Sequence, residues 1–310
     1  MSLQKIYSVF QNINSCTDWS LQLLRVSKSR RDGAHYASRE IRLSPPGRIM
    51  EFVNEVADRY IGRQGGLLAS YSCVEDYDGS AVGTTIYRLA SDADVIASEY
   101  REFVEALANP EAEADPLSIN PQACVVKGQI TIDEDDVALK LISMQKPITT
   151  LKHKFLHDNG IFREISEKVL SLRPTLDIII VDDTVYFLTM AGESLFNMER
   201  SYRTICNEKI ETIRGMDIMS DYDIFSETAA SGHNPRRFLA FNQGRLTALG
   251  NRTTRRAMAR KFAIPLRDDK FDTTVTGVSE KIVKLLCNRG MVDPFEDSAV
   301  EVAGAKRWQW

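Results

Sequence analysis

The stretch Leu176–Met190, LDIIIVDDTVYFLTM, contains the longest apolar run in the chain. Two segments rich in Ile, Val, Tyr and Phe, Leu176–Val181 and Thr184–Met190, flank the acidic pair Asp182-Asp183. Short apolar runs of β-branched and aromatic residues on either side of a two-residue polar break are typical of a β-hairpin. The stretch therefore predicts a buried pair of antiparallel strands.

A second hairpin is expected upstream of the first. Ala123–Thr131 and Val137–Met144 alternate or run apolar around an acidic turn at Asp133–Asp136. Further strands are predicted in the N-terminal third of the chain, at Trp19–Val26, Leu67–Val74 and Gly83–Leu89.

Apolar residues recur at helical spacing in several segments, which predicts amphipathic helices. These segments are Ile49–Ile61, Asp92–Leu107, Gly192–Ile213 and Val278–Cys287. The chain between the two hairpins, Phe155–Leu172, is also expected to be helical. Strands and helices thus occur throughout the sequence.

One segment, Asn109–Pro121 (NPEAEADPLSINP), is poor in apolar residues and rich in proline and acid. Such composition is typical of a boundary between domains. We therefore predict an α+β protein with a smaller mixed N-terminal domain, residues 1–110, and a larger C-terminal domain, residues 121–310. In the C-terminal domain the two β-hairpins are expected to pack against several helices.

The composition limits the classes of function. The 310 residues include 39 basic and 43 acidic side chains, a net charge of −4, so binding to a polyanion must come from a local patch. The five cysteines are widely spaced without a CxxC pair, which favours a reducing cytosol over a zinc ribbon or a disulfide framework. No apolar run approaches the ~20 residues that span a bilayer, and the N-terminus lacks the features of a secretory signal. We expect a cytoplasmic protein.

Between Thr228 and Arg267 the chain has nine basic residues and no acidic one. The guanidinium group of arginine presents a planar fork of donors that matches phosphate oxygens. Asn251 is expected to cap a helix that carries Arg252, Arg256 and Arg260 on one stripe, with Arg255 beside them and Met258 and Phe262 buried opposite. The predicted nucleic-acid-binding residues of the basic helical region 228–267 are Arg236, Arg237, Arg245, Arg252, Arg255, Arg256, Arg260 and Lys261. The alternative is a solvated helix face that pairs with acidic residues elsewhere in the fold.

A secondary basic group lies at the predicted turn after the first strand and contains Lys28, Arg30 and Arg31. Charged residues at a hairpin tip often serve solubility, so the sequence leaves this group open between solubility and binding.

Catalytic chemistry has weaker support in the sequence. Asp177, Asp182 and Asp183 border a buried strand pair, where metal-dependent nucleases hold magnesium, but the Lys expected two residues after the second acid is missing. His153 and His157 have the i, i+4 spacing of helical metal ligands without the Glu of the zincin pattern. We therefore predict no catalytic residue, metal site or cofactor, and keep a metal-dependent nuclease as an alternative.

Four longer segments carry a family resemblance: LKLISMQKPITTLKHKFLHDNG, VYFLTMAGESLFNMERSY, GHNPRRFLAFN and LLCNRGMVDPFED. They resemble the KwaB family, the cytosolic component of the Kiwa anti-phage defence system of bacteria. The resemblance implies a non-enzymatic DNA-binding protein that forms at least a homodimer. It also implies assembly with the transmembrane protein KwaA, and hence a location peripheral to the bacterial inner membrane. A protein-interaction scaffold whose arginines meet an acidic partner is a further alternative.

Overall fold

The computed structural model describes residues 3–16, 18–29, 33–45, 47–62, 65–111, 120–144, 148–150, 155–158, 161–164, 168–287, 290–292 and 299–301. The chain divides into two compact units. The first, here called the sheet unit, comprises Met1–Asp76 and Gly83–Met198. The second, the helical unit, comprises Tyr77–Val82 and Glu199–Trp310. The mixture of helices with a largely antiparallel sheet confirms the predicted α+β class.

The sheet unit is built on an eight-stranded sheet in the order β2-β1-β5-β6-β11-β12-β4-β3. All neighbouring strands are antiparallel except the parallel pair β3 and β4. Both predicted hairpins are confirmed, with Val126 opposite Leu141 and Ile179 opposite Tyr186. The strands are β1 (Ser20–Ser29), β2 (Gly33–Ile41), β3 (Cys73–Asp76), β4 (Thr85–Ala90), β5 (Ala123–Ile132), β6 (Asp135–Ser143), β11 (Ile178–Val181) and β12 (Thr184–Phe187).

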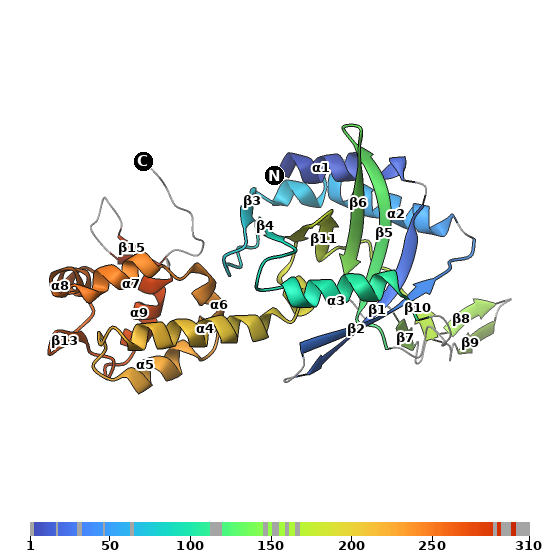
Figure 1. Ribbon diagram of the computed structural model, residues 1–310. Helices are drawn as coiled ribbons and strands as arrows, with labels where there is room; N and C mark the ends of the chain where they lie inside the picture. The colour runs from blue at the N-terminus through green and yellow to red at the C-terminus, as the bar shows by residue number, and fades with distance from the viewer. Residues whose placement is uncertain are drawn as a thin grey trace. The chain divides into compact units, whose positions relative to one another are not determined.

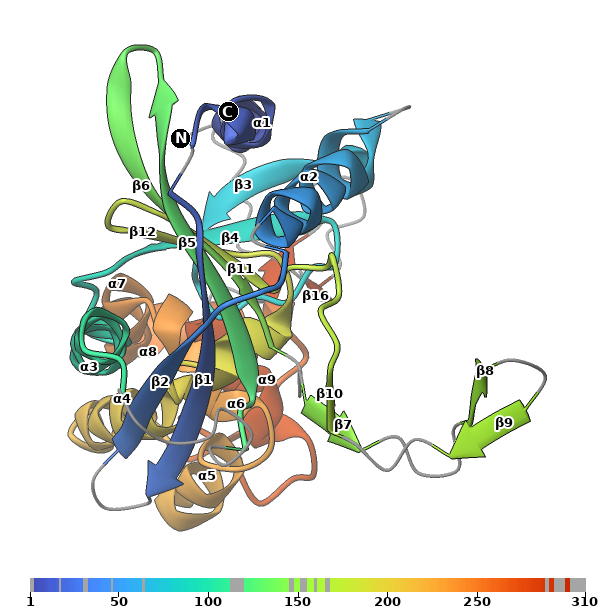
Figure 2. The ribbon, with the colours of Figure 1, turned by 90° about the vertical axis from the view of Figure 1, so that its right-hand side faces the viewer.

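Helices cover both faces of this sheet, as Figure 2 shows. On one face lie α1 (Leu3–Gln11) and α2 (Arg48–Ile61), whose buried side chains join the core formed with Ile179 and Tyr186. On the other face lies α3 (Ala97–Ala108), where Phe103 contacts Phe196 edge to face at 5.7 Å between ring centroids. Because β11 is enclosed on both faces, every one of its four residues is apolar and buried, which explains its continuous apolar run.

The division of the chain differs from the predicted boundary at Asn109–Pro121. Strand β5, which follows that segment, pairs with β1, which precedes it, so Leu21 lies opposite Val126. The start of the segment is also tied to β2, because the Glu111 amide donates to the Ser38 carbonyl at 2.9 Å and its carboxylate pairs with Arg39 at 3.1 Å. Both hairpins therefore belong to the sheet unit together with the N-terminal strands.

The predicted helix at Phe155–Leu172 is wrong. The described residues there form the short strands β8 (Phe155–Asp158), β9 (Ile161–Glu164) and β10 (Lys168–Leu170), and β10 pairs with β7 (Ile148–Thr150). Asn159-Gly160 lies between β8 and β9 in the sequence, and this dipeptide is one of the strongest sequence signals for a two-residue hairpin turn.

Apart from the loop Tyr77–Val82, the helical unit begins with α4 (Met198–Arg214), which belongs to it from Glu199 on (Figure 1). Its core contains Phe225, Phe238, Leu246, Phe271 and Ile282. None of the helices in the described part of the chain has the length and hydropathy needed to cross a bilayer. The remaining elements of this unit are α5 (Tyr222–Ala229), α6 (Asn234–Arg237), α7 (Gln243–Gly250), α8 (Arg252–Lys261), β13 (Leu266–Arg267), β14 (Lys270–Phe271), α9 (Val278–Leu286), β15 (Gly290–Val292) and β16 (Ala299–Glu301).

Candidate nucleic-acid interface

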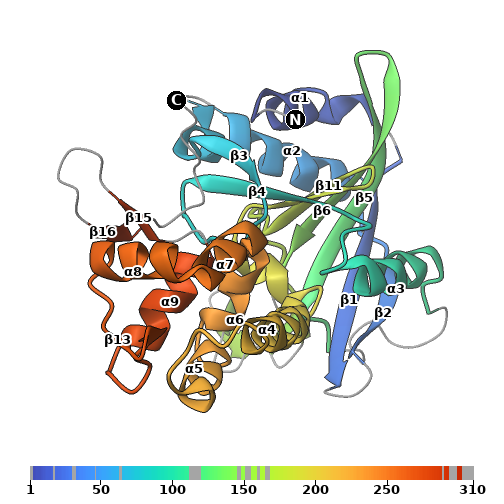
Figure 3. The ribbon, with the colours of Figure 1, turned by 60° about the vertical axis from the view of Figure 1, so that its left-hand side comes forward.

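The basic region is built on two consecutive helices, α7 and α8, seen in Figure 3 above α9. The Asn242 side chain accepts a hydrogen bond from the Arg245 amide and caps α7. The Asn251 side chain accepts from the amides of Thr253 and Thr254, at 2.9 and 3.2 Å, and caps α8. Helix α8 therefore begins at Arg252, as the sequence predicts, because asparagine satisfies amides that have no partner inside a first helical turn.

One face of α8 packs on the core of the helical unit. Ala259 is buried there, and Met258 and Phe262 pack against the same cluster, as predicted. The opposite face carries Arg252, Arg256 and Arg260, which are exposed. Residues four apart on an α-helix are displaced by about 6 Å along its axis, so these side chains form a row. We call these three residues the α8 arginine row.

The prediction that α8 displays four arginines outward is wrong for Arg255. This side chain is only 9% exposed. Its Nε donates to the Asp269 carbonyl at 2.6 Å, and its Nη1 donates to the carbonyls of Leu249 and Gly250 at 2.8 and 3.2 Å. Arg255 therefore joins the end of α7 to the turn between β13 and β14, and it is not available to a partner.

The α8 arginine row is also partly neutralised. The Asp269 carboxylate pairs with Arg252 through Oδ2 and with Arg256 through Oδ1, the latter at 2.5 Å. The hydrogen bond from Arg256 is the main cause that lowers the pKa of the Asp269 carboxyl below its ordinary value. Asp269 lies two residues beyond the acid-free stretch, so a search confined to that stretch could not find it. The side chain of Arg260 has no hydrogen bond or ion pair with any other described residue, and Lys261 beside it is exposed.

Three other predicted binding residues stabilise the helical unit. Arg236 donates to the Tyr77 hydroxyl at 3.1 Å and to the Ser80 carbonyl at 2.9 Å, which holds the loop Tyr77–Val82. Arg237 pairs with Glu280 of α9, and Arg245 donates to the Leu285 carbonyl at 2.7 Å. These contacts engage guanidinium groups that the sequence assigned to a ligand, so a binding role for these three arginines stays a prediction.

The secondary basic group lies on the sheet unit. Lys28 is an exposed residue of β1, opposite Ala34 of β2. Arg30 and Arg31 lie outside the described residues, so their part of the prediction stays a prediction.

The three carboxylates of the nuclease alternative do not converge. Asp177 precedes β11 whereas Asp182 and Asp183 follow it, a separation of five residues or about 16 Å along a strand. Asp177 accepts from the Met144 amide at 2.7 Å and from the Thr189 hydroxyl, and Asp182 accepts from the Ala138 amide at 3.0 Å. These hydrogen bonds hold the two ends of β11 in the sheet. They explain why acidic residues flank a buried strand without any need for a bound metal ion.

The histidine pair gives no helical metal site, because His157 belongs to strand β8 and His153 lies outside the described residues. Within the described ranges no group of three or more His, Cys, Asp or Glu side chains is arranged to hold a metal ion.

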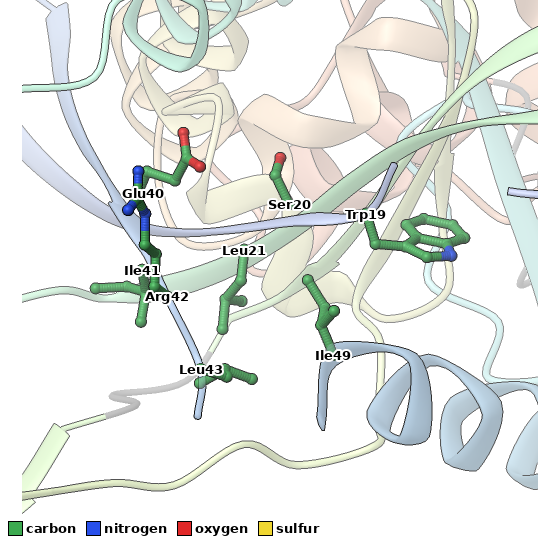
Figure 4. A pocket seen from close by; sticks show the side chains of 8 residues that line it. All are labelled: Trp19, Ser20, Leu21, Glu40, Ile41, Arg42, Leu43 and Ile49. Atoms are coloured by element: carbon green, nitrogen blue, oxygen red, sulfur yellow. The ribbon is translucent and has the colours of Figure 1, made fainter. Parts of the chain in front are cut away.

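A cavity in the sheet unit, with Glu40 and Arg42 among its lining residues, has a volume of only about 200 Å³. Figure 4 shows Leu21, Leu43 and Ile49 converging on one side of β1, with the Ser20 hydroxyl on the other side. Ligand pockets usually enclose roughly 300–1,000 Å³ with several convergent polar groups. The exposed face of α8 is therefore the stronger candidate for function.

Comparison of the chain with models of protein families, with curated proteins and with solved structures finds no match. The resemblance to the KwaB family therefore stays a prediction.

Proposed function

We propose that the protein binds duplex DNA through the phosphate backbone, with the α8 arginine row at the centre of the contact. The single observation that supports this most is the exposed row itself, since the side chain of its third member, Arg260, has no hydrogen bond or ion pair among the described residues. Arginine forks bind phosphate oxygens well, and three of them along one helix suit a polyanion better than a single small anion.

The charge distribution along the chain supports the same proposal. The residues of the helical unit comprise 19 basic and 16 acidic side chains, a net charge of +3, whereas those of the sheet unit comprise 20 basic and 27 acidic, a net charge of −7. A unit of positive charge within an acidic protein directs a polyanion to one part of the chain. Exposed ion pairs such as those of Asp269 contribute little to stability, so a phosphate can replace them at small cost.

The test removes the row from the full-length protein. We expect Arg252→Ala, Arg256→Ala and Arg260→Ala together to weaken binding to a fluorescent duplex. We also expect the dependence of log affinity on log salt to flatten by about 0.9 for each phosphate that the variant no longer binds. Because the arginines bind phosphate, the weakening is expected to be similar for duplexes of unrelated sequence.

The matched control is Arg203→Ala on α4. Arg203 is exposed and pairs with Glu199 at 2.9 Å, so this variant also removes an exposed arginine with a carboxylate partner. Unchanged affinity and salt dependence in the folded triple variant would refute the proposal, as would an equal loss of affinity in the control.

On the resemblance to the KwaB family we further propose a role in anti-phage defence. In this proposal the protein forms at least a homodimer and docks on KwaA, which places it at the bacterial inner membrane without insertion of its own. Cell fractionation with and without KwaA tests the location, and light scattering of the purified protein tests the assembly. A monomeric mass at micromolar concentration contradicts the homodimer, and membrane recovery that ignores KwaA contradicts the docking.

A further inference from the structure

Three arginines of α8 converge on one residue, Asp269. The buried Arg255 bonds to its carbonyl oxygen, and the exposed Arg252 and Arg256 bond to its two carboxylate oxygens. The backbone and the side chain of Asp269 thus provide acceptors for three guanidinium groups of α8, a helix that precedes this residue in the chain.

The position of Asp269 is fixed by its own turn. Arg267 of β13 lies opposite Lys270 of β14 in the antiparallel register. The two residues between them, Asp268 and Asp269, have φ values of 50° and 61°. Aspartate and asparagine adopt this left-handed region more readily than most residues. The turn is held in place by Arg255 beneath it and by the ion pair of Lys270 with Asp217 at 2.6 Å. The carboxylate therefore sits on a supported loop.

The two arginines that hold this carboxylate remain open to solvent. The side chains of Arg252 and Arg256 are 63% and 52% exposed, whereas that of Asp269 is 22% exposed. A carboxylate and a phosphodiester each carry one negative charge shared by two oxygens, and an arginine fork binds either. The pair therefore already has the arrangement of a two-arginine anion site, occupied by a group of the same chain.

We propose that Arg252 and Arg256 form an anion clamp that Asp269 fills in the free protein and that a phosphodiester of DNA takes over on binding. This proposal rests on the proposed DNA-binding function. It adds that the Asp269 carboxylate competes with DNA phosphate for the two arginines. In this arrangement Asp269 keeps the two guanidinium groups close together and lowers the affinity for phosphate, because the incoming group has to displace a carboxylate.

The experiment compares Asp269→Asn with Asp268→Asn in the full-length protein. Both variants remove one negative charge from the same turn, and asparagine tolerates the left-handed backbone at both positions. Asp268 is exposed and has no hydrogen bond or ion pair with another described residue, so it measures the effect of charge alone. The carbonyl that receives Arg255 is retained in either variant.

We expect Asp269→Asn to bind a fluorescent duplex about fivefold more tightly than Asp268→Asn, as suits charge-assisted hydrogen bonds freed from an internal partner. Its salt dependence is expected to steepen by about 0.9 for each additional phosphate that the freed arginines bind. Equal affinities of the two variants, or weaker binding by Asp269→Asn, would overturn the clamp. Should Asp269→Asn fail to fold, Asp269→Gly replaces it, since glycine favours the same backbone conformation.

A second measurement separates failure of the clamp from failure of the proposed function. Titration with inorganic phosphate at constant ionic strength is expected to raise the melting temperature of Asp269→Asn more than that of Asp268→Asn. If no protein binds the duplex but phosphate stabilises Asp269→Asn selectively, Arg252 and Arg256 form an anion site that Asp269 fills, and DNA is not its ligand. If neither probe distinguishes the two variants, the clamp is wrong.

Discussion

The sheet unit and the helical unit accommodate buried arginine in different ways. In the sheet unit, the Arg39 side chain is 8% exposed and meets the Glu111 carboxylate, so its charge is balanced. In the helical unit, Arg255 meets only carbonyl oxygens among the described residues, so its charge is solvated by dipoles and not cancelled. The charge of a residue therefore does not give its role. The basic region contains a structural arginine (Arg255), arginines paired with a carboxylate of the same chain (Arg252 and Arg256) and one that is open to solvent (Arg260).

The two units also differ in what holds them together. The sheet unit encloses its sheet between apolar layers, with Phe103, Phe187 and Phe196 packed together on one face. The helical unit adds to its apolar core several charged anchors, among them the buried Arg255 and the half-buried Arg237–Glu280 pair. This comparison predicts which substitutions damage each unit.

The largest expected effect is that of Phe196→Ala in the sheet unit. Phe196 is fully buried, and its ring centroid lies 5.7 Å from that of Phe103 and 6.3 Å from that of Phe187. Removal of a buried phenylalanine ring costs about 3–5 kcal/mol of the free energy of unfolding. Urea unfolding followed by circular dichroism measures it, with Leu67→Ala at a 38% exposed position as the control. A similar loss of stability in both variants would contradict the conclusion that packing of buried apolar side chains holds the sheet unit together.

Arg255→Ala is expected to have the next largest effect, in the helical unit. The substitution leaves one buried and two half-buried carbonyl oxygens without their charged donor, which costs about 2–4 kcal/mol of the free energy of unfolding. Arg256→Ala, the exposed neighbour, is expected to change stability little. If Arg255→Ala weakened DNA binding while melting at the wild-type temperature, Arg255 would be a ligand residue and the distinction between structural and open cations would fail.

The smallest expected effect concerns the pH dependence of the Arg237–Glu280 pair. Burial alone raises the pKa of Glu280, but hydrogen bonds from Asn234 and Arg237 and the charges of Arg237 and Lys284 bring it below the ordinary value of 4.5. A carboxyl whose pKa is lower in the folded state stabilises the protein above its unfolded pKa and loses this contribution as the pH falls through the folded value.

Wild-type protein is therefore expected to melt above Glu280→Gln at pH 7, with a difference that shrinks below about pH 4.5. Asp76→Asn is the control from the sheet unit, because Asp76 also has a lowered pKa through its hydrogen bond from Arg88 but is largely exposed. Thermal melting of the three proteins over a pH series measures the differences. A difference for Glu280→Gln that stays constant with pH would show that the charge of Glu280 is not what stabilises α9.

Several elements could be predicted because their signals are local. The hairpin β11–β12 follows from its apolar runs around Asp182-Asp183, and helix α8 follows from the cap at Asn251 and the buried spacing of Met258 and Phe262. Helix α1 is not among the predicted elements, although Ile6, Val9 and Phe10 lie at helical spacing, because so short an apolar pattern at a chain end is a weak signal. The strands β8 and β9 carry a local turn signal in Asn159-Gly160, which competes there with the helical pattern that the prediction followed.

The sequence alone determined the fold class, the two hairpins and the composition of the basic region, since these depend on residues a few positions apart. Only the tertiary structure determined that β5 pairs with β1 across the predicted boundary, and which of the cations reach solvent. The guanidinium of Arg255 is matched by a carbonyl 14 residues away, and that of Arg236 by a hydroxyl 159 residues away. Partners at such distances along the chain meet only when the core has formed, because apolar burial and not local backbone preference brings their segments together.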